Sequence, residues 1–495
     1  MQSKRIVRLS NLKLTSLLSQ KYTSSYVGNK ILGIVREQHG MWERRAPLTP
    51  PQVKQLLDQL PGSKVLVQPC TRRIFPNEQY EAAGATITDD LSAANFILGV
   101  KSVKANELIP NKSYMFFSHT IKAQPYSMPL LDTIIEKKVR LFDYECITKE
   151  GRDDAPRLVA FGNYAGRAGM IDGLQGLGIR LLAEGYSTPL LHLPNTYMHR
   201  SYEEVKQRLK VIGEMIKTNG FPKALSPVVF AFTGNGNVAK GAIEIFEHLP
   251  HEYISVEDLP TLKDEISQGK RKSNLIYAVK LKTSDLVRHK TDPIRFSKDD
   301  YYRFPENYEP VFHENVLPYV TMLVNGIYWD ARFPRLITKQ QMAQLRKSGN
   351  GNLRAVADIS CDIGGSVEFL SRPTSIETPF YTYNPEKGEI QDHVDAKGVL
   401  MLGVDNLPTE LPADASNHFG TRLLPLLPPL LTAKDGNYEN LPPELKRACI
   451  ASDGALTPKW NYITRLREQT AVMTNTTKTP KVTPSSYVKI ELMVR

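Results

Sequence analysis

A glycine-rich turn at residues 228–246 constrains the fold of this chain more than any other feature. The run Val228–Phe232 is short and apolar throughout, which is typical of a strand covered on both faces of a sheet. A turn and then helical periodicity follow it. Gly234 permits a tight turn, Gly236 leaves room for a pyrophosphate beside the backbone, and Ala239 lets the helix pack close to its strand. The stretch predicts dinucleotide binding, and the plain alternative is an ordinary strand–helix turn.

The length and composition indicate a globular protein of several domains. A chain of 495 residues is expected to form two or three domains. No apolar run reaches the ~20 residues that span a bilayer, so we expect no membrane partner. The four cysteines lie far apart, and no cysteine or histidine cluster has the spacing of a metal site. We therefore expect reduced thiols and no metal.

The net charge of +11 is concentrated at the two ends of the chain. Residues 1–30 contain six basic residues and no acidic one, and residues 476–495 have a net charge of +3. The body is therefore nearly neutral, which argues against a nucleic-acid partner. Residues 1–27 are basic and rich in Ser and Leu, as in a mitochondrial presequence, so we expect the mitochondrial matrix. A plain disordered tail is the alternative. Residues 471–495 are polar and predict a flexible tail.

Short apolar runs alternate with helical segments in two parts of the chain, which predicts an α/β fold. We expect two doubly wound, Rossmann-like domains with parallel sheets and a cleft between them. Residues 28–160 lack a glycine fingerprint and are assigned to a substrate and catalytic domain, to which segment 404–470 returns. Residues 225–403 are assigned to the dinucleotide-binding domain, and residues 161–224 to interdomain helices. The expected strands are Ile31–Val35, Val65–Val67, Phe96–Val100, Tyr114–Phe117, Val139–Phe142, Val228–Phe232, Tyr253–Val256, Leu275–Val279, Thr321–Val324 and Ala355–Ile359.

Five glycines recur at spacings of three or four residues and would share one helix face: Gly162, Gly166, Gly169, Gly173 and Gly176. Glycine costs up to ~1 kcal/mol relative to alanine inside a helix. Such a stripe therefore predicts that another backbone packs very close to this face. We interpret the segment as the long helix that joins the two domains.

Two basic side chains follow expected strands of the first domain. Lys101 comes directly after Phe96–Val100, and His119 comes shortly after Tyr114–Phe117. Ligands of open parallel sheets bind beyond the carboxyl ends of the strands. If these strands are neighbours, Lys101 and His119 meet and could supply a proton donor and a proton acceptor, since histidine titrates near pH ~6.5. The alternative is that Lys101 is merely the first solvated residue after a strand and His119 is a loop histidine.

Three further side chains are candidates for substrate binding. Arg36 directly follows the first expected strand, Arg45 lies in the loop beyond it, and a guanidinium group binds a carboxylate through a bidentate fork. Asp358 ends an apolar run in the second domain and could hold an ammonium group or a ribose hydroxyl. A capping loop is the alternative interpretation of Asp358.

Taken in order, these residues resemble the lysine-forming saccharopine dehydrogenases. They are most similar to lysine–ketoglutarate reductase, the N-terminal half of the bifunctional alpha-aminoadipic semialdehyde synthases. The broader relatives are alanine dehydrogenase and the transhydrogenase α subunit, which share the two-domain plan. The matching phrases extend from about residue 30 to 470 and are WERRAPLTP (42–50), ILGVK (97–101), FFSHTIKAQ (116–124), VAFGNYAGRAGM (159–170), FTGNGNVAKGA (232–242), NGIYW (325–329), ADISCDIGGSVEF (357–369) and VDNLPTELPADAS (404–416).

The resemblance implies a reaction and a set of residue roles. L-Lysine and 2-oxoglutarate would condense, and the imine would be reduced by NADPH to saccharopine, in the first step of lysine degradation. A homo-oligomer is compatible with the family. The implied roles are acid/base chemistry for Lys101 and His119, carboxylate binding for Arg36 and Arg45, pyrophosphate binding for Gly234, Gly236 and Ala239, and a place facing the nicotinamide for Asp358.

The cofactor is a point on which the residues and the resemblance differ. Glu257 follows Tyr253–Val256 about 20 residues past the turn, and an acidic residue there favours NADH through its ribose hydroxyls. The resemblance implies NADPH, whose 2′-phosphate the basic residues at 270–272 could reach. We expect NADPH rather than NADH.

Two other functions remain open at this point. One is an alanine-dehydrogenase-like reductive aminase that acts on pyruvate and ammonia. The other is a non-catalytic, nucleotide-binding regulatory module. The bifunctional relatives also continue into a saccharopine-oxidising domain, and this chain ends near where that domain would begin.

Overall fold

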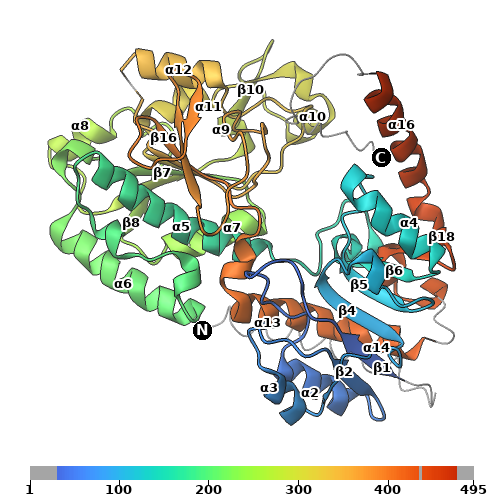
Figure 1. The fold of residues 1–495 in the computed structure, drawn as a ribbon. Helices are drawn as coiled ribbons and strands as arrows, with labels where there is room; N and C mark the ends of the chain where they lie inside the picture. Colours follow the sequence, from blue (N-terminus) through green and yellow to red (C-terminus); the bar gives the residue numbers. More distant parts are fainter. Residues whose placement is uncertain (1–29, 350, 434–437, 477–495) are drawn as a thin grey trace. The chain divides into compact units, whose positions relative to one another are not determined.

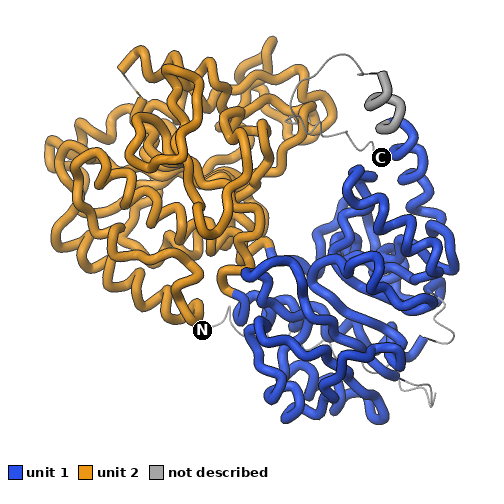
Figure 2. The backbone as a smooth tube through the Cα atoms, viewed as in Figure 1, with its two compact units in different colours: residues 1–161, 412–494 blue, residues 162–411, 495 orange. Residues whose placement is uncertain are grey.

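The computed structural model describes residues 30–349, 351–433 and 438–476 (Figure 1). The chain divides into two compact units: unit 1 comprises residues 1–161 and 412–494, and unit 2 comprises residues 162–411 (Figure 2). The sequence places the corresponding boundaries at residues 160 and 404. The expected presequence, residues 1–27, lies outside the described residues.

Unit 1 is built on an eight-stranded sheet with the order β18-β17-β6-β5-β4-β1-β2-β3. The first six strands of the chain pair in parallel, while β17 and β18 add an antiparallel edge beside β6. The chain therefore winds outward from β1 in both directions, which is the expected doubly wound plan. The strands are β1 (Ile31–Ile34), β2 (Lys64–Val67), β3 (Thr86–Ile87), β4 (Phe96–Lys101), β5 (Ser113–Phe117), β6 (Arg140–Asp143), β17 (Cys449–Ser452) and β18 (Ala455–Leu456).

The helices of unit 1 come from both ends of the chain. Thr49 precedes the first helix, α2 (Pro50–Gln59), and its N–H donates a hydrogen bond to the Gln52 side chain at 2.8 Å. Helix α16 continues through Thr476, so residues 471–476, predicted as part of a flexible tail, are helical; residues 477–495 lie outside the description. The helices are α2 (Pro50–Gln59), α3 (Asn77–Ala82), α4 (Met128–Glu136), α13 (Pro412–Leu423), α14 (Leu427–Thr432), α15 (Pro443–Ala448) and α16 (Tyr462–Thr476).

Unit 2 contains a second eight-stranded sheet, with the order β15-β14-β16-β13-β12-β7-β9-β8. Its six strands from β16 to β8 are parallel, and β14 and β15 form an antiparallel edge. A small antiparallel pair, β10 with β11, lies outside this sheet. The strands are β7 (Val229–Thr233), β8 (His251–Tyr253), β9 (Ile276–Lys280), β10 (Val287–His289), β11 (Tyr308–Pro310), β12 (Met322–Asn325), β13 (Ala355–Asp358), β14 (Phe380–Asn384), β15 (Glu389–Gln391) and β16 (Val399–Leu402).

The strand that neighbours β7 is β9, although β8 comes first along the chain. The usual dinucleotide-binding order places the second strand of the chain beside the first. Here the second strand, β8, is instead the edge of the sheet. This exchange moves the residues that follow β8 away from the glycine turn.

Helix α5 (Gly162–Ala183) forms as the glycine spacing predicts, and its glycines allow very close packing. A Cβ atom at Gly166 would lie 1.9 Å from the carbonyl oxygen of Val238, and one at Gly241 would lie 2.0 Å from that of Asn163. The backbones of α5 and α7 therefore touch. The helix belongs to unit 2, whereas the sequence analysis interpreted it as a link between domains. The helices of this unit are α5, α6 (Tyr202–Asn219), α7 (Asn237–Phe246), α8 (Leu262–Ser267), α9 (Thr283–Leu286), α10 (Lys298–Arg303), α11 (Phe312–Asn315) and α12 (Lys339–Lys347).

Among the described residues, no helix is both long and apolar enough to cross a membrane. The same residues contain no group of three or more His, Cys, Asp and Glu side chains that could hold a metal ion. The four cysteines, all within the described residues, form no disulfide.

Candidate functional site

Lys101 and His119 lie at the carboxyl ends of neighbouring parallel strands in unit 1. Lys101 ends β4 and pairs in register with Phe117 of β5, two residues before His119. Burial, and then the charge of Lys101, hold the pKa of the nearby His39 below its usual range, and His119 adds to the effect. The two strands are therefore parallel neighbours, as the sequence analysis required, while the meeting of the Lys101 and His119 side chains and their roles remain predictions. His39 was missed by the sequence analysis.

The turn that carries His119 is held by a buried carboxylate. His119 has a left-handed backbone with φ of 56°, which is uncommon outside glycine. Asp143, at the end of β6, accepts hydrogen bonds from the Ser118 N–H at 2.9 Å and from the Ser118 hydroxyl. Burial, with repulsion from Glu145, raises the pKa of Asp143 to about 6. The position of His119 is thus fixed by its neighbour in the chain.

A second buried carboxylate holds the backbone of Lys101. Between Leu98 and Lys101 the register with β5 shifts, so the ladder is interrupted by a bulge. Glu37 accepts hydrogen bonds from the N–H groups of Val100 at 2.6 Å and Lys101 at 3.1 Å. Burial, followed by repulsion from Glu43, raises the pKa of Glu37 to about 7. Sequence reasoning missed Glu37, although an acidic residue in the loop directly after a buried strand was an available signal.

Arg45 is engaged in a buried ion pair. Its side chain is 4% exposed, and its Nε and Nη2 atoms donate to Glu43 at 2.8 and 2.6 Å. The guanidinium carbon lies 4.2 Å from the centre of the Phe161 ring. Although burial opposes it, Arg45 together with Lys101 holds the pKa of Glu43 below its usual range. The fork of Arg45 is therefore already occupied by a carboxylate of the protein.

The Arg36 side chain forms an exposed ion pair and also lines a pocket that Lys101 shares. Arg36 and Asp89 form a solvent-exposed ion pair at 2.7 Å. Arg36 also lines a small pocket beyond β1 and β4, with Lys101, Lys104 and Glu107 among the other lining residues. The pocket is lined by three cationic side chains, those of Arg36, Lys101 and Lys104, and also by the carboxyl groups of Glu37 and Glu107.

The glycine turn of unit 2 has the geometry that a pyrophosphate requires. Gly234 has φ of 88°, and a Cβ atom there would lie 2.6 Å from the carbonyl oxygen of Gly326. A Cβ atom at Gly236 would meet nothing within 4 Å, so the space above this position is open. Helix α7 begins at Asn237 with its first N–H groups free for an anion, and Ala239 is buried. These residues fit a dinucleotide.

Beside this turn, polar side chains end three neighbouring strands, β7, β12 and β13. The Thr233 hydroxyl donates to Asn325 at 2.7 Å, and the Asn325 amide donates to Asp358 at 3.0 Å. Burial raises the pKa of Asp358 to about 6. Its Oδ2 atom is buried and has no hydrogen-bond partner in the described structure, so it can accept one from a ligand. Asn325 was missed, although it ends an apolar run at a carboxyl end.

Glu257 does not lie beside the glycine turn at Gly234–Gly236, which corrects the expectation that it meets the cofactor ribose there. It follows β8, and β9 separates that strand from β7. Lys270 and Lys272 also lie elsewhere, because they precede β9 at the amino end of the strand. Arg271 is surrounded by three carboxylates, those of Glu252 at 2.8 Å, Glu265 at 2.6 Å and Asp258 at 3.5 Å. None of these basic residues therefore remains a suitable phosphate ligand.

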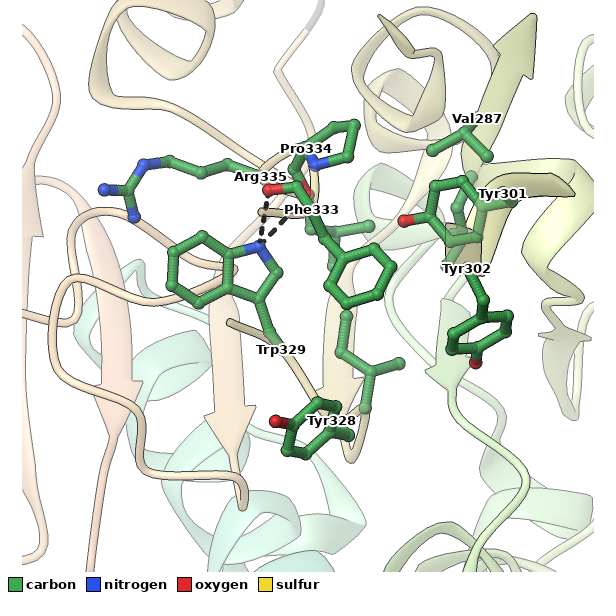
Figure 3. A pocket seen from close by; sticks show the side chains of 11 residues that line it. Val287, Tyr301, Tyr302, Tyr328, Trp329, Phe333, Pro334 and Arg335 are labelled. Carbon is green, nitrogen blue, oxygen red and sulfur yellow. Dashed lines mark hydrogen bonds between the residues drawn. The ribbon is translucent and has the colours of Figure 1, made fainter. Parts of the chain in front are cut away.

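An aromatic pocket follows β12, as Figure 3 shows. The indole N–H of Trp329 donates to the carbonyl oxygens of Phe333 and Pro334, both at 3.1 Å, while Arg335 lies over the ring at 5.0 Å. Tyr301 and neighbouring aromatic residues pack against this group. These contacts stabilise the pocket.

Comparisons with known proteins match the two halves of the fold. The family model described as Alanine dehydrogenase/PNT, N-terminal domain, matches residues 33–168. The model described as Alanine dehydrogenase/PNT, C-terminal domain, matches residues 312–459. A solved structure of L-alanine dehydrogenase superimposes with a TM-score of 0.56 at 16% identity and covers 88% of this chain and 99% of that one. The expected pair of α/β units with largely parallel sheets is confirmed, and the cleft between them stays a prediction.

The chain is also similar to curated proteins of lysine metabolism. It is 44% identical to alpha-aminoadipic semialdehyde synthase of Arabidopsis thaliana, over 89% of this chain and 42% of that protein. It is 38% identical to the mitochondrial protein of the same name from Bos taurus, over 94% of this chain and 50% of that protein. A saccharopine dehydrogenase [NAD(+), L-lysine-forming] of Candida albicans is 24% identical over 78% of this chain and 88% of its own length. The chain thus spans about half the length of the two synthases.

Proposed function

Because this chain belongs to the alanine dehydrogenase/PNT family, we propose that it is a lysine–ketoglutarate reductase. In this reaction L-lysine condenses with 2-oxoglutarate, and the imine is reduced to saccharopine at the expense of NADPH. The similarity to alpha-aminoadipic semialdehyde synthases from a plant and a mammal supports this choice of substrates. The reaction would be the first step of lysine degradation.

One observation carries the proposal: Lys101 and His119 share one edge of a parallel sheet, beside a pocket lined by Arg36 and Lys104. Condensation of an amine with a keto acid needs groups that remove and deliver protons, and both substrates carry carboxylates. A histidine and a lysine beside further cationic side chains meet these requirements.

The proposed chemistry divides the proton transfers between two side chains. His119 removes a proton from the ε-ammonium group of lysine, so that the amine can attack the keto carbon. Lys101 donates a proton to the oxygen that leaves as water. Arg36 holds a substrate carboxylate, and the Arg45–Glu43 pair supports the loop without binding substrate directly. Glu37 and Asp143 keep the two reacting side chains in place through backbone contacts.

Unit 2 would hold the cofactor, which supplies a hydride when bound. Gly234, Gly236 and Ala239 would lie under the pyrophosphate, with the first N–H groups of α7 directed at it. Asp358 would accept a hydrogen bond from the nicotinamide half or from a substrate ammonium group. Nicotinamide nucleotide use is common to the family, and NADPH is our specific proposal.

We also propose the mitochondrial matrix as the location. The relative from Bos taurus is named mitochondrial, and the composition of residues 1–27 is typical of a presequence. A homo-oligomer stays a prediction.

A substrate matrix tests the proposed function. Purified protein is given NADPH or NADH, with 2-oxoglutarate or pyruvate, and with lysine or ammonia, and the loss of absorbance at 340 nm is followed. We expect rapid oxidation of NADPH only when lysine and 2-oxoglutarate are both present. Oxidation that requires ammonia and pyruvate would favour an alanine-dehydrogenase-like reductive aminase. Tight cofactor binding without turnover in any mixture would favour a regulatory module.

A further inference from the structure

We infer that Lys282 binds the 2′-phosphate of NADPH and thereby determines the preference for this cofactor. The inference rests on the proposed function, because it assigns the cofactor specificity of the same reaction. It follows from the unusual strand order of unit 2, in which β9 replaces β8 as the neighbour of β7.

The residue that meets the adenosine ribose is set by the strand next to the glycine turn. In dinucleotide-binding sheets the ribose lies beyond the carboxyl end of the strand beside the first one. Parallel strands lie about 4.8 Å apart, so β8 is about 10 Å from β7 and β9 is about 5 Å from it. The ribose would therefore meet the residues after β9, where Lys282 lies, and not Glu257 after β8.

Backbone contacts place Lys282 directly beside the turn. The N–H of Leu281, one residue past the end of β9, donates to the carbonyl oxygen of Phe232 at 2.9 Å. Phe232 lies two residues before Gly234. Lys282 is the next residue after Leu281, and its N–H donates to Asp285 at 2.7 Å. The start of its side chain is therefore fixed near the carboxyl end of β7.

The ammonium group of Lys282 is available for a ligand. Its side chain is exposed, and in the described part of the chain no carboxylate lies within 4.0 Å of it. Lys280, two residues earlier, is committed instead, since its Nζ atom lies 3.1 Å from Glu247 and 3.7 Å from the centre of the Tyr253 ring. Of the two lysines at this end of β9, Lys282 is the one that can bind an added anion.

Glu257 lies within electrostatic reach of Lys282 and opposes a phosphate. Hydrogen bonds from its own backbone and from Ser255 lower the pKa of Glu257, and the positive charge of Lys282 lowers it further. The carboxylate is therefore ionised at neutral pH. Removal of the Glu257 charge should improve binding of a 2′-phosphate, whereas removal of the Lys282 charge should weaken it.

NADPH differs from NADH by a phosphate monoester on the 2′-oxygen of the adenosine ribose. Such a group carries close to two negative charges at neutral pH, whereas the 2′-hydroxyl of NADH is neutral. A lysine acts on it as a point charge without a geometric requirement. Loss of Lys282 should therefore affect ligands with the phosphate and leave those without it nearly unchanged.

Binding of half-cofactors tests this inference without the reaction. The affinities of full-length protein for 2′,5′-ADP and 5′-AMP are measured by calorimetry at 0.1 M salt, for the native protein, Lys282→Ala and Glu257→Gln. Lys272→Ala is the matched control, because it removes the same charge at the amino end of β9. We expect Lys282→Ala to weaken 2′,5′-ADP about tenfold and 5′-AMP less than twofold. Glu257→Gln should strengthen 2′,5′-ADP, and Lys272→Ala should change neither ligand.

Three results would overturn the assignment: unchanged 2′,5′-ADP binding by Lys282→Ala, equal weakening of both ligands, or a native protein that binds both ligands equally. Circular dichroism of each variant separates loss of fold from loss of the phosphate contact. A protein that shows the expected Lys282 dependence but never oxidises NADPH with lysine and 2-oxoglutarate would refute the proposed function alone. The converse result, normal turnover with no Lys282 dependence, would refute only this inference.

Discussion

At the scale of single residues, the proposed chemistry depends most on His119. The variant His119→Gln keeps a polar side chain of similar size but cannot transfer a proton near neutral pH. We expect its kcat to fall by ~10²-fold or more, with little change in KM for 2-oxoglutarate. The measurement is lysine-dependent oxidation of NADPH at saturating substrate. His393→Gln is the control, because His393 is exposed and lies in unit 2, outside the candidate site. Near-normal turnover by His119→Gln would remove this residue from the mechanism.

Asp358 provides a second prediction at this scale, in the form of a pH dependence of stability. Its buried carboxyl has a pKa raised from 3.8 to about 6, so the folded protein binds a proton more tightly than the unfolded chain does. The stabilising effect of that proton is complete below about pH 4 and is lost as pH rises through 6. Asp358→Asn stays neutral over this range, and its side-chain oxygen can keep the hydrogen bonds that Asn325 and Ser360 donate to Oδ1.

The variant should therefore gain stability relative to the native protein by about 1.5 kcal/mol between pH 5 and pH 8. Urea unfolding at several pH values measures this difference. A difference that stays constant across the range would show that Asp358 does not titrate as its burial indicates.

A substitution at Gly236 can test cofactor binding while leaving the fold intact. A side chain at this position would meet nothing within 4 Å, and its backbone is extended, so Gly236→Val should fold normally. The added methyl groups would occupy the space that a pyrophosphate needs. We expect only a small fall in melting temperature, because valine is a poorer N-cap of α7 than glycine, and at least a tenfold loss of NADPH affinity, measured by fluorescence titration. Unchanged affinity would place the dinucleotide elsewhere.

At the scale of elements, the contact between α5 and α7 positions the glycine turn. Gly166→Ala would force a Cβ atom to within 1.9 Å of a carbonyl oxygen on α7, and backbone cannot give way as a side chain can. We expect a loss of about 3 kcal/mol or more in the free energy of unfolding, because α7 must shift. In the control Gly213→Ala, on α6, the nearest atom lies 3.3 Å away, so the change should be small. Equal stability of the two variants would contradict this account of the stripe.

The elements that sequence analysis predicts well are those with a purely local signal. The parallel strands β1, β4, β5, β7, β12 and β13 are short apolar runs, and each lies within a residue or two of its expected place. The strands β14 to β18 were not predicted. Of these, β17 pairs antiparallel with β6 from the other end of the chain, which no local signal reveals. The strands β15 and β18 have only three and two residues and pair with the strand directly before them, so they are too short for a clear pattern.

The candidate site follows the same division. Lys101, His119, Gly234 and Asp358 could be proposed as site residues because each follows or ends a strand that the sequence reveals. Glu257 was misplaced because strand order depends on tertiary packing and cannot be derived from the order along the chain. The occupation of Arg45 by Glu43, two residues away, and the contact of Glu37 with β4 likewise arise only when the loop after β1 folds back.

At the scale of the whole molecule, unit 2 is continuous in sequence and unit 1 is not. Phe419 of the returning segment stacks on Phe161 at 4.5 Å and packs edge-on against Tyr144 at 4.8 Å, so unit 1 needs both of its segments. Residues 162–411 expressed alone should therefore unfold cooperatively and bind NADPH. Residues 30–161 alone should lack cooperative unfolding. Calorimetry of both fragments checks this, and a stably folded 30–161 fragment would contradict the division.

The most direct test of the proposed reaction is the identity of its product. Purified protein is incubated with NADPH, 2-oxoglutarate and lysine labelled with ¹⁵N at the ε-amine, and the mixture is analysed by mass spectrometry. We expect saccharopine that retains the label, formed in equal amount to the NADPH consumed. Consumption of NADPH with glutamate as the product, or no labelled saccharopine at all, would contradict it.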